Sequence, residues 1–145
     1  MSIKEEIQNA IKDAMRAKDS VRLECLRMAK GALMLKEKES GDALDDETVI
    51  AVLRTEVRKR QQSIDIFREH GKEEAATATE GEIAVLESFM PKQLSEADLE
   101  ERVKAYLADH PDITHAGKLT GALKKELGDL ADGKLLNAAC RKALG

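Results

Sequence analysis

The chain has 145 residues, of which 42% are hydrophobic and 36% are charged. This balance is too apolar for a disordered chain and too charged for a membrane protein, so we expect a folded, soluble protein. With two Phe, one Tyr and no Trp, the core must be aliphatic, which suits packing between helices. The sequence opens without a signal-peptide pattern and has no apolar stretch of about 20 residues, so we expect no membrane association and a cytoplasmic location.

The net charge of −4 is distributed unevenly. Residues 1–112 carry 18 Lys and Arg against 25 Asp and Glu, whereas residues 113–145 carry six against three. The last part of the chain is therefore basic within an otherwise acidic protein. The two cysteines, Cys25 and Cys140, have no CxxC or histidine-paired spacing, so they are predicted to be buried thiols.

Start and stop signals divide the first part of the chain into four predicted helices. The predicted starts are Ser2, Asp19–Ser20, Asp45 or Asp46, and Thr79, and the last three helices end at Gly41, Gly71 and Pro91. Residues 72–78 are predicted to be a connection, because Thr79 and Glu82 match the S/T-x-x-E capping box. No strand-like alternation appears.

The strongest start signal in the chain lies at Ser95. Asp98 completes an acidic variant of the capping box, and Leu94 and Leu99 occupy the positions of a hydrophobic staple. A turn over 109–112 ends this helix, and two more helices are predicted over about 114–127 and 132–144. The sequence therefore predicts an all-α fold, with an N-terminal helical domain at 1–92 followed by a C-terminal three-helix module at 95–145.

No self-contained catalytic site is evident. The three histidines, His70, His110 and His115, lie at predicted helix ends or in a turn, without the spacing of metal ligands, and are predicted to be surface or capping residues. The pair Gly117-Lys118 lacks the first glycine and the hydroxyl residue of a phosphate-binding loop. We therefore predict no catalytic residue, no metal site and no cofactor.

A cluster of basic residues on the third predicted helix has two explanations. Arg54, Arg58, Lys59 and Arg60 lie where the apolar stripe of that helix is thinnest. They could meet phosphates, but arginine-rich helix faces more commonly lie in water or pair with acidic residues of neighbouring helices. We favour the second explanation.

Two glycines interrupt the predicted helix at 114–127. Gly117 and Gly121 each cost about 1 kcal/mol relative to alanine within a helix, so a compensating role is expected. One role is tight packing against another helix, which the spacing alone favours. The other is close approach of a phosphate or ribose backbone.

Several segments resemble the YqeY family. They are the run Glu82–Glu96 with its central Phe89-Met90-Pro91-Lys92, the stretch Gly117-Lys-Leu-Thr-Gly121, the turn Ala131-Asp-Gly-Lys134, the opening stretch Ala14–Asp19, and Leu26-Arg27. The resemblance covers essentially the whole chain. The chain departs from the family pattern at Thr120 and Lys124, where methionine is common in the family, and at Gly128, which comes one position early.

The resemblance implies an RNA partner. The C-terminal module of this family (the GatB/YqeY domain) is similar to the tail domain of the B subunit of glutamine-dependent aspartyl/glutamyl-tRNA amidotransferase, which is associated with holding tRNA. The implied function is an accessory protein that binds tRNA or a tRNA-linked amidotransferase or aminoacylation complex. The candidate RNA-binding residues are Gly117, Lys118, Gly121, Lys124, Lys125, Arg141 and Lys142.

Two other functions remain open. The chain could be a helical protein-interaction adaptor that does not bind RNA, with its acidic first part meeting the partner. It could also be a non-autonomous component of a carbon-nitrogen ligase that uses glutamine as the amide donor, active only within a complex. The resemblance brings no catalytic residue with it.

Overall fold

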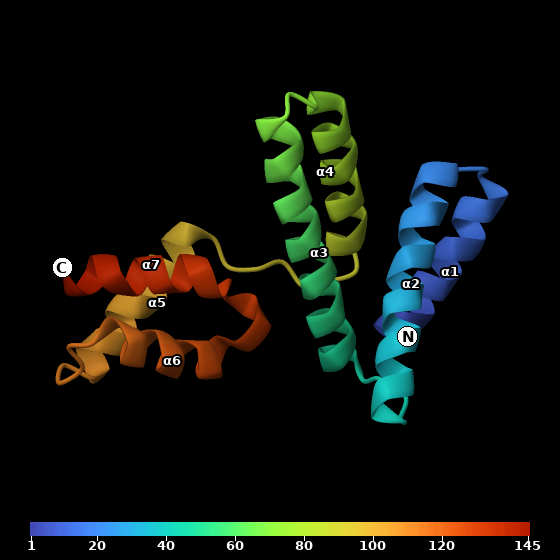
Figure 1. Ribbon diagram of the computed structural model, residues 1–145. Coiled ribbons are helices and arrows are strands. Elements are labelled where there is room, and N and C mark those ends of the chain that lie inside the picture. Colours follow the sequence, from blue (N-terminus) through green and yellow to red (C-terminus); the bar gives the residue numbers. More distant parts are fainter. The chain divides into compact units, whose positions relative to one another are not determined.

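The computed structural model describes residues 1–145 and is entirely helical (Figure 1). The all-α prediction is therefore confirmed. The chain divides into two compact units, Met1–Pro91 and Lys92–Gly145, and each unit has a hydrophobic core of its own. None of the helices is both long enough and apolar enough to cross a membrane.

Unit 1 consists of two helical hairpins, α1 with α2 and α3 with α4 (Figure 1). The helices are α1 (Ile3–Arg16), α2 (Ser20–Ser40), α3 (Asp46–Glu69) and α4 (Glu73–Glu87). Its fully buried side chains come from all four helices and include Ile7, Leu26, Leu33, Leu53 and Leu86. Because these aliphatic residues interlock between helices, the core needs no aromatic side chain.

The first three helix starts of unit 1 are confirmed as predicted. The side chain of Ser2 accepts a hydrogen bond from the Glu5 backbone N–H at 3.2 Å. Asp19 and Asp45 cap α2 and α3 in the same way. The second helix ends at Gly41, which has a φ of 79°, a conformation that favours glycine at a helix C-terminus.

The predicted connection over 72–78 is wrong, because α4 begins at Glu73. Thr79 is not a cap; it is buried inside α4, and its hydroxyl donates to the carbonyl oxygen of Ala75 at 2.8 Å. Two effects favour the earlier start. Glu73 and Glu74 lie in the first turn, where negative charge stabilises a helix, and Glu73 also pairs with Arg68 of α3 at 3.1 Å.

Unit 2 is a three-helix module with one short 3₁₀ turn. Its elements are α5 (Glu96–Asp109), α6 (Ala116–Leu127), η1 (Gly128–Leu130) and α7 (Gly133–Leu144). Both hydrogen bonds of the predicted capping box are present between Ser95 and Asp98. Asp132 caps α7 by accepting from the backbone N–H groups of Lys134 and Leu135 at 3.0 Å.

The segment before α5 belongs structurally to unit 2. The backbone N–H of Leu94 donates to the carbonyl oxygen of Leu130 at 2.8 Å, and the Gln93 side chain donates to the carbonyl oxygen of Asp129 at 2.9 Å. Leu94 also packs against the core of the module. These contacts hold the segment that precedes α5, Gln93 and Leu94, against the turn that joins α6 to α7.

Candidate nucleic-acid interface

The two glycines of α6 lie on the side of the helix that faces away from the core. Leu119, Leu123 and Leu127 are buried and fix the inner side of α6. Gly121 is two positions from both Leu119 and Leu123, and positions two apart in an α-helix are separated by about 200°. Gly121 therefore lies near the middle of the outer side of the helix, where it is exposed.

Packing within the chain does not explain Gly121. A Cβ atom placed at this residue would have no neighbour within 4 Å, so alanine would fit there and would favour the helix by about 1 kcal/mol. Gly117 is different, because a Cβ atom there would lie 3.0 Å from Cε1 of His115. The tight-packing explanation thus fails for Gly121, whereas the cap of α6 accounts for Gly117.

His115 is the N-cap of α6, as the capping prediction for the histidines anticipates. Its Nδ1 accepts a hydrogen bond from the Gly117 backbone N–H at 3.1 Å. His110 lies at the C-terminus of α5, where its ring stacks on that of Tyr106 with the ring centroids 4.1 Å apart. Neither histidine belongs to a group of His, Cys, Asp or Glu side chains that could hold a metal ion.

The lysines of α6 fall into two kinds. Lys118 and Lys125 are exposed and make no ion pair. Lys124 is half-buried, and its Nζ donates to the carbonyl oxygens of Gly128, at 3.0 Å, and Ala131. These carbonyl groups follow the C-terminus of α6, so Lys124 neutralises the negative end of its own helix.

The two candidate cations of α7 also differ. Lys142 pairs with Glu100 of α5 at 3.0 Å, and the hydrogen bond from that pairing raises the pKa of Lys142. Arg141 is exposed and has no such partner. Of the predicted cationic residues, Lys118, Lys125 and Arg141 are therefore the ones whose charges are not already engaged within unit 2.

Thr120 provides a polar link that the sequence does not reveal. Its hydroxyl lies 2.7 Å from the carbonyl oxygen of Ala116 and 3.2 Å from Oδ1 of Asn137 on α7. A hydroxyl carries a single hydrogen, so it donates to one of these two oxygens at a time. This position is one of the two at which the resemblance favours methionine, and in this chain it carries a polar contact between α6 and α7.

The basic cluster of α3 is largely engaged within unit 1. Arg60 is buried, with 7% of its surface exposed, and its guanidinium group lies 3.4 Å from Oε1 of Glu56 and 3.6 Å from Oε1 of Glu82. Lys59 also pairs with Glu56. The prediction that this cluster pairs with acidic residues of a neighbouring helix is confirmed for Arg60, through Glu82 of α4, whereas Lys59 pairs within its own helix.

The remaining basic residues of the cluster do not form a common surface with Arg60. Arg54 donates to the carbonyl oxygen of Pro91 at 2.9 Å, at the end of unit 1. Arg58 is exposed. The cluster is therefore divided between the interior, the end of the unit and solvent.

Both cysteines are free and buried, which confirms the prediction. The thiol of Cys25 lies 3.7 Å from the backbone carbonyl oxygen of Glu82. Burial raises the pKa of the Cys25 thiol, although the nearby charge of Arg60 acts in the opposite direction. The thiol is thus held in its neutral form, which is the unreactive one.

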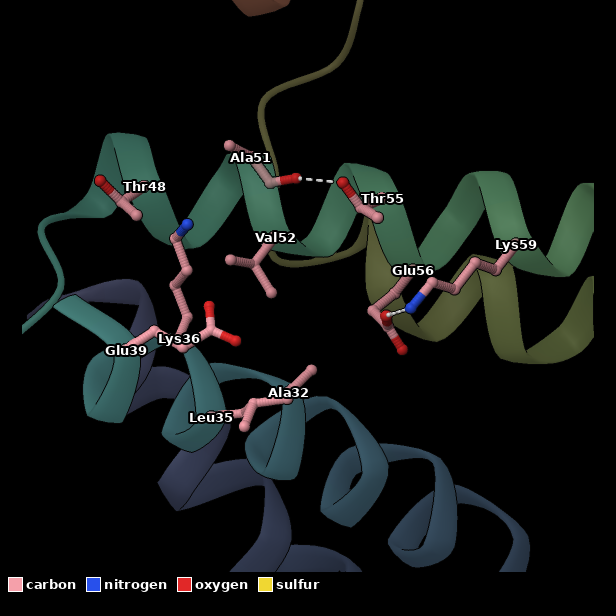
Figure 2. A pocket seen from close by; sticks show the side chains of 10 residues that line it. All are labelled: Ala32, Leu35, Lys36, Glu39, Thr48, Ala51, Val52, Thr55, Glu56 and Lys59. Atoms are coloured by element: carbon pink, nitrogen blue, oxygen red, sulfur yellow. Dashed lines mark hydrogen bonds and ion pairs between the residues drawn. The ribbon is translucent and has the colours of Figure 1, made fainter.

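Unit 1 has an open groove of about 350 Å³ between α2 and α3 (Figure 2). Its apolar residues include Ala32 and Leu35 of α2 and Ala51 and Val52 of α3. The hydroxyl of Thr55 is engaged by its own helix, where it donates to the carbonyl oxygen of Ala51 at 3.2 Å. The polar groups of this groove do not form the nucleophile and base arrangement that catalysis would need.

The fold and the outer side of α6 define a class: an all-helical protein of two units, the second of which is a three-helix module with an exposed glycine between exposed lysines. The family model described as Yqey-like protein matches residues 4–144. The chain therefore belongs to the YqeY family. No curated protein matches it.

Proposed function

We propose that this protein binds tRNA through unit 2 and acts in the cytoplasm as an accessory to a tRNA-linked amidotransferase or aminoacylation complex. The observation that carries the proposal is the outer side of α6. Gly121 is exposed there, with nothing near the position of its missing side chain, and exposed Lys118 and Lys125 lie on the same side of the helix. We call Gly121, Lys118 and Lys125 the glycine face.

A glycine face of this kind suits a sugar-phosphate backbone. The bare helix at Gly121 allows close approach, and positive side chains on the same side of the helix can contact phosphate oxygens. Such contacts position a nucleic acid without reading its sequence. The proposal therefore concerns the backbone of a folded RNA and not a base sequence.

The excess of basic over acidic residues in 113–145 supports the same partner, because the first part of the chain has the opposite excess. A polyanion would be attracted to this part of the chain and repelled by unit 1. Lys124 and Lys142 contribute charge, but their side chains are held by carbonyl oxygens and by Glu100. We therefore assign the direct phosphate contacts to Lys118, Lys125 and Arg141.

The experiment measures the affinity of the full chain for bulk tRNA as a function of salt concentration. About three phosphate contacts predict a slope of log K against log salt of roughly −2 to −3. The double variant Lys118→Gln/Lys125→Gln should reduce this slope by about one to two units. Its matched control is Lys92→Gln/Lys104→Gln, which removes the same charge from exposed positions elsewhere in unit 2. The control should reduce the salt-dependence slope by less than the Lys118/Lys125 variant does.

A second pair of variants tests close approach without changing charge. Gly121→Leu should weaken tRNA binding, because its side chain projects from the centre of the glycine face. Gly81→Leu is the control, since Gly81 is also an exposed glycine inside a helix with nothing within 4 Å of a Cβ atom. If the full chain shows no measurable affinity for tRNA at about 50 mM salt, or if each variant binds like its control, the proposal is wrong.

A further inference from the structure

A polar pair links α6 to α7, which run in opposite directions in unit 2 (Figure 1). The hydroxyl of Thr120 lies 3.2 Å from Oδ1 of Asn137. Both side chains are half-buried, so the pair lies where the contact between the two helices meets the solvent. We call Thr120 and Asn137 the α6–α7 seam.

The amide group of Asn137 is engaged at one end only. Its Oδ1 faces Thr120, whereas Nδ2 forms no hydrogen bond within the chain. Nδ2 is not enclosed either, because the enclosed side-chain atom that lacks a partner is Nε of Arg60. The seam therefore presents an amide group to a ligand at a fixed place. Asparagine is a poor helix former, so this group is not explained by the stability of α7 alone.

The bare part of α6 lies between the seam and the lysines of the glycine face. At about 100° per residue, Thr120 lies about 100° from Gly121 on one side of the helix. Lys125 and Lys118 lie about 40° and 60° from Gly121 on the other side. A chain that lies against Gly121 therefore meets the lysines at one edge and the seam at the other.

Two further cations border the seam on α7. Lys134 and Arg141 are exposed, and neither forms an ion pair. Around α7 they lie about 60° and 40° from Asn137, on the side that is turned away from the buried Leu136 and Cys140. Because the two helices are antiparallel, one α7 cation lies across the seam from each lysine of the glycine face. We call the two lysines on α6, and Lys134 with Arg141 on α7, the cation rows.

No acidic side chain interrupts the cation rows. Helix α7 contains no Asp or Glu. The single acidic residue of α6 is Glu126, which lies about 140° from Gly121 around the helix and thus outside the glycine face. The seam is therefore a neutral amide group between two rows of positive charge, which is complementary to a sugar edge bordered by phosphates.

We infer that Asn137 recognises the ribose 2′-hydroxyl of double-helical RNA, while the cation rows hold the phosphates on either side. This inference rests on the proposed binding of RNA by unit 2. The minor groove of A-form RNA is wide and shallow and displays the 2′-hydroxyls, and proteins bind it through those hydroxyls and the phosphates across the groove. The ligand of the seam is therefore an RNA stem.

A hydroxyl suits the Asn137 amide better than a phosphate oxygen does. The two ends of an asparagine amide, one a donor and one an acceptor, exchange places by a half-turn of the side chain. A 2′-hydroxyl both donates and accepts, so it pairs with either end, whereas a phosphate oxygen only accepts. Since DNA lacks this hydroxyl, the contact distinguishes RNA from DNA.

The experiment compares two hairpins of one sequence, one of RNA and one with 2′-fluoro riboses. The fluorine keeps the A-form shape and the phosphate charge but removes the hydroxyl. The full chain should bind the RNA hairpin about three- to tenfold more tightly, which corresponds to one neutral hydrogen bond. Asn137→Ala should abolish this preference without changing the salt dependence, because no charge is lost. Alanine is the better helix former, so circular dichroism should show intact helices.

The matched variant on the same helix is Lys134→Gln. It should weaken the binding of both hairpins alike and reduce the slope of log K against log salt by about one unit, while the preference for the RNA hairpin remains. Equal binding of the two hairpins by the unaltered chain, or a preference that survives in Asn137→Ala, would overturn the inference and leave RNA binding standing. Failure to bind either hairpin at about 50 mM salt would overturn the proposed function and this inference with it.

Discussion

Arg60 of α3 and Glu82 of α4 form an ion pair in the interior of unit 1, with Nε of Arg60 3.6 Å from Oε1 of Glu82. Nε is fully enclosed and has no hydrogen-bond acceptor, so the attraction to Glu82 acts through charge alone at this atom. Cys25 of α2 contacts the backbone of the same glutamate. Glu82 is thus a point at which three helices meet.

Truncation of Arg60 should destabilise unit 1. Arg60→Ala leaves Glu82 without its cation, removes one of the two cations that pair with Glu56, and opens a cavity. Loss of one partner of a buried ion pair costs about 3–5 kcal/mol. Because Glu82 is partly exposed, we expect about 2–3 kcal/mol here. Chemical denaturation followed by circular dichroism measures this loss. Arg58→Ala, an exposed neighbour, should change stability by less than about 0.5 kcal/mol.

Protonation of the Asp45 carboxylate should destabilise unit 1 at low pH. Hydrogen bonding from Thr48, through its side chain and its backbone N–H, lowers the pKa of Asp45. A lowered pKa contributes stability that is present above the unfolded value, about 3.9, and is lost as the pH falls through the folded value.

The measurement compares Asp45→Asn with the unaltered chain across this range. Asparagine is also a good N-cap but does not titrate, so the variant should lose less stability between about pH 5 and pH 2. Asp42→Asn provides the control, since Asp42 is exposed in the preceding loop and caps no helix. Equal acid sensitivity of all three proteins would contradict the assignment.

Unit 2 should fold alone, and its lead-in residues should matter. A fragment of residues 92–145 retains the bonds from Gln93 and Leu94 to Asp129 and Leu130, whereas a fragment of 95–145 loses both. Each net hydrogen bond contributes about 0.5–1.5 kcal/mol, and the packing of Leu94 adds to this. We expect both fragments to be helical by circular dichroism, with the longer one more stable by about 1–3 kcal/mol. Equal melting temperatures would show that these contacts contribute nothing.

Lys124 should stabilise unit 2, in contrast to Lys125. Lys124→Gln removes a charged donor from the carbonyl oxygens of Gly128 and Ala131, which we expect to cost about 1 kcal/mol at a half-buried site. Lys125→Gln changes an exposed side chain without an ion pair and should be neutral within about 0.5 kcal/mol. Thermal melts of the 92–145 fragment would separate the two. Because Lys124→Gln should also change stability, the tRNA-binding experiment substitutes Lys118 and Lys125 instead.

Sequence reasoning located most helices because their ends carry local signals. Ser2, Asp19, Asp45 and Ser95 each accept the capping hydrogen bond that their position predicts. It failed at α4, where the pattern at Thr79 and Glu82 matched a capping box by chance. The start at Glu73 is favoured by the acidic first turn and by the ion pair of Glu73 with Arg68 of α3. The second of these, a contact between helices, has no signature in a local pattern.

The candidate interface was predictable as a set of residues but not as a set of free charges. The sequence and the resemblance indicated Gly121, Lys118, Lys124 and Lys125 together on one predicted helix, and in the structure all four lie on α6, with Gly121, Lys118 and Lys125 exposed. They could not show that Lys124 is engaged by carbonyl groups or that Lys142 pairs with Glu100. Those partners come from later turns and from another helix, so they become visible only once the chain is folded.

The stacked pair of Tyr106 and His110 gives unit 2 a spectroscopic label of its own. Tyr106 is the only tyrosine in the chain, which has no tryptophan, so ultraviolet emission excited in the tyrosine band reports on unit 2, while helical circular dichroism reports on both units. If the two units unfold separately, the emission and dichroism curves of one denaturation will not coincide. A single unlabelled sample of the full chain therefore suffices to follow unit 2 in the presence of unit 1.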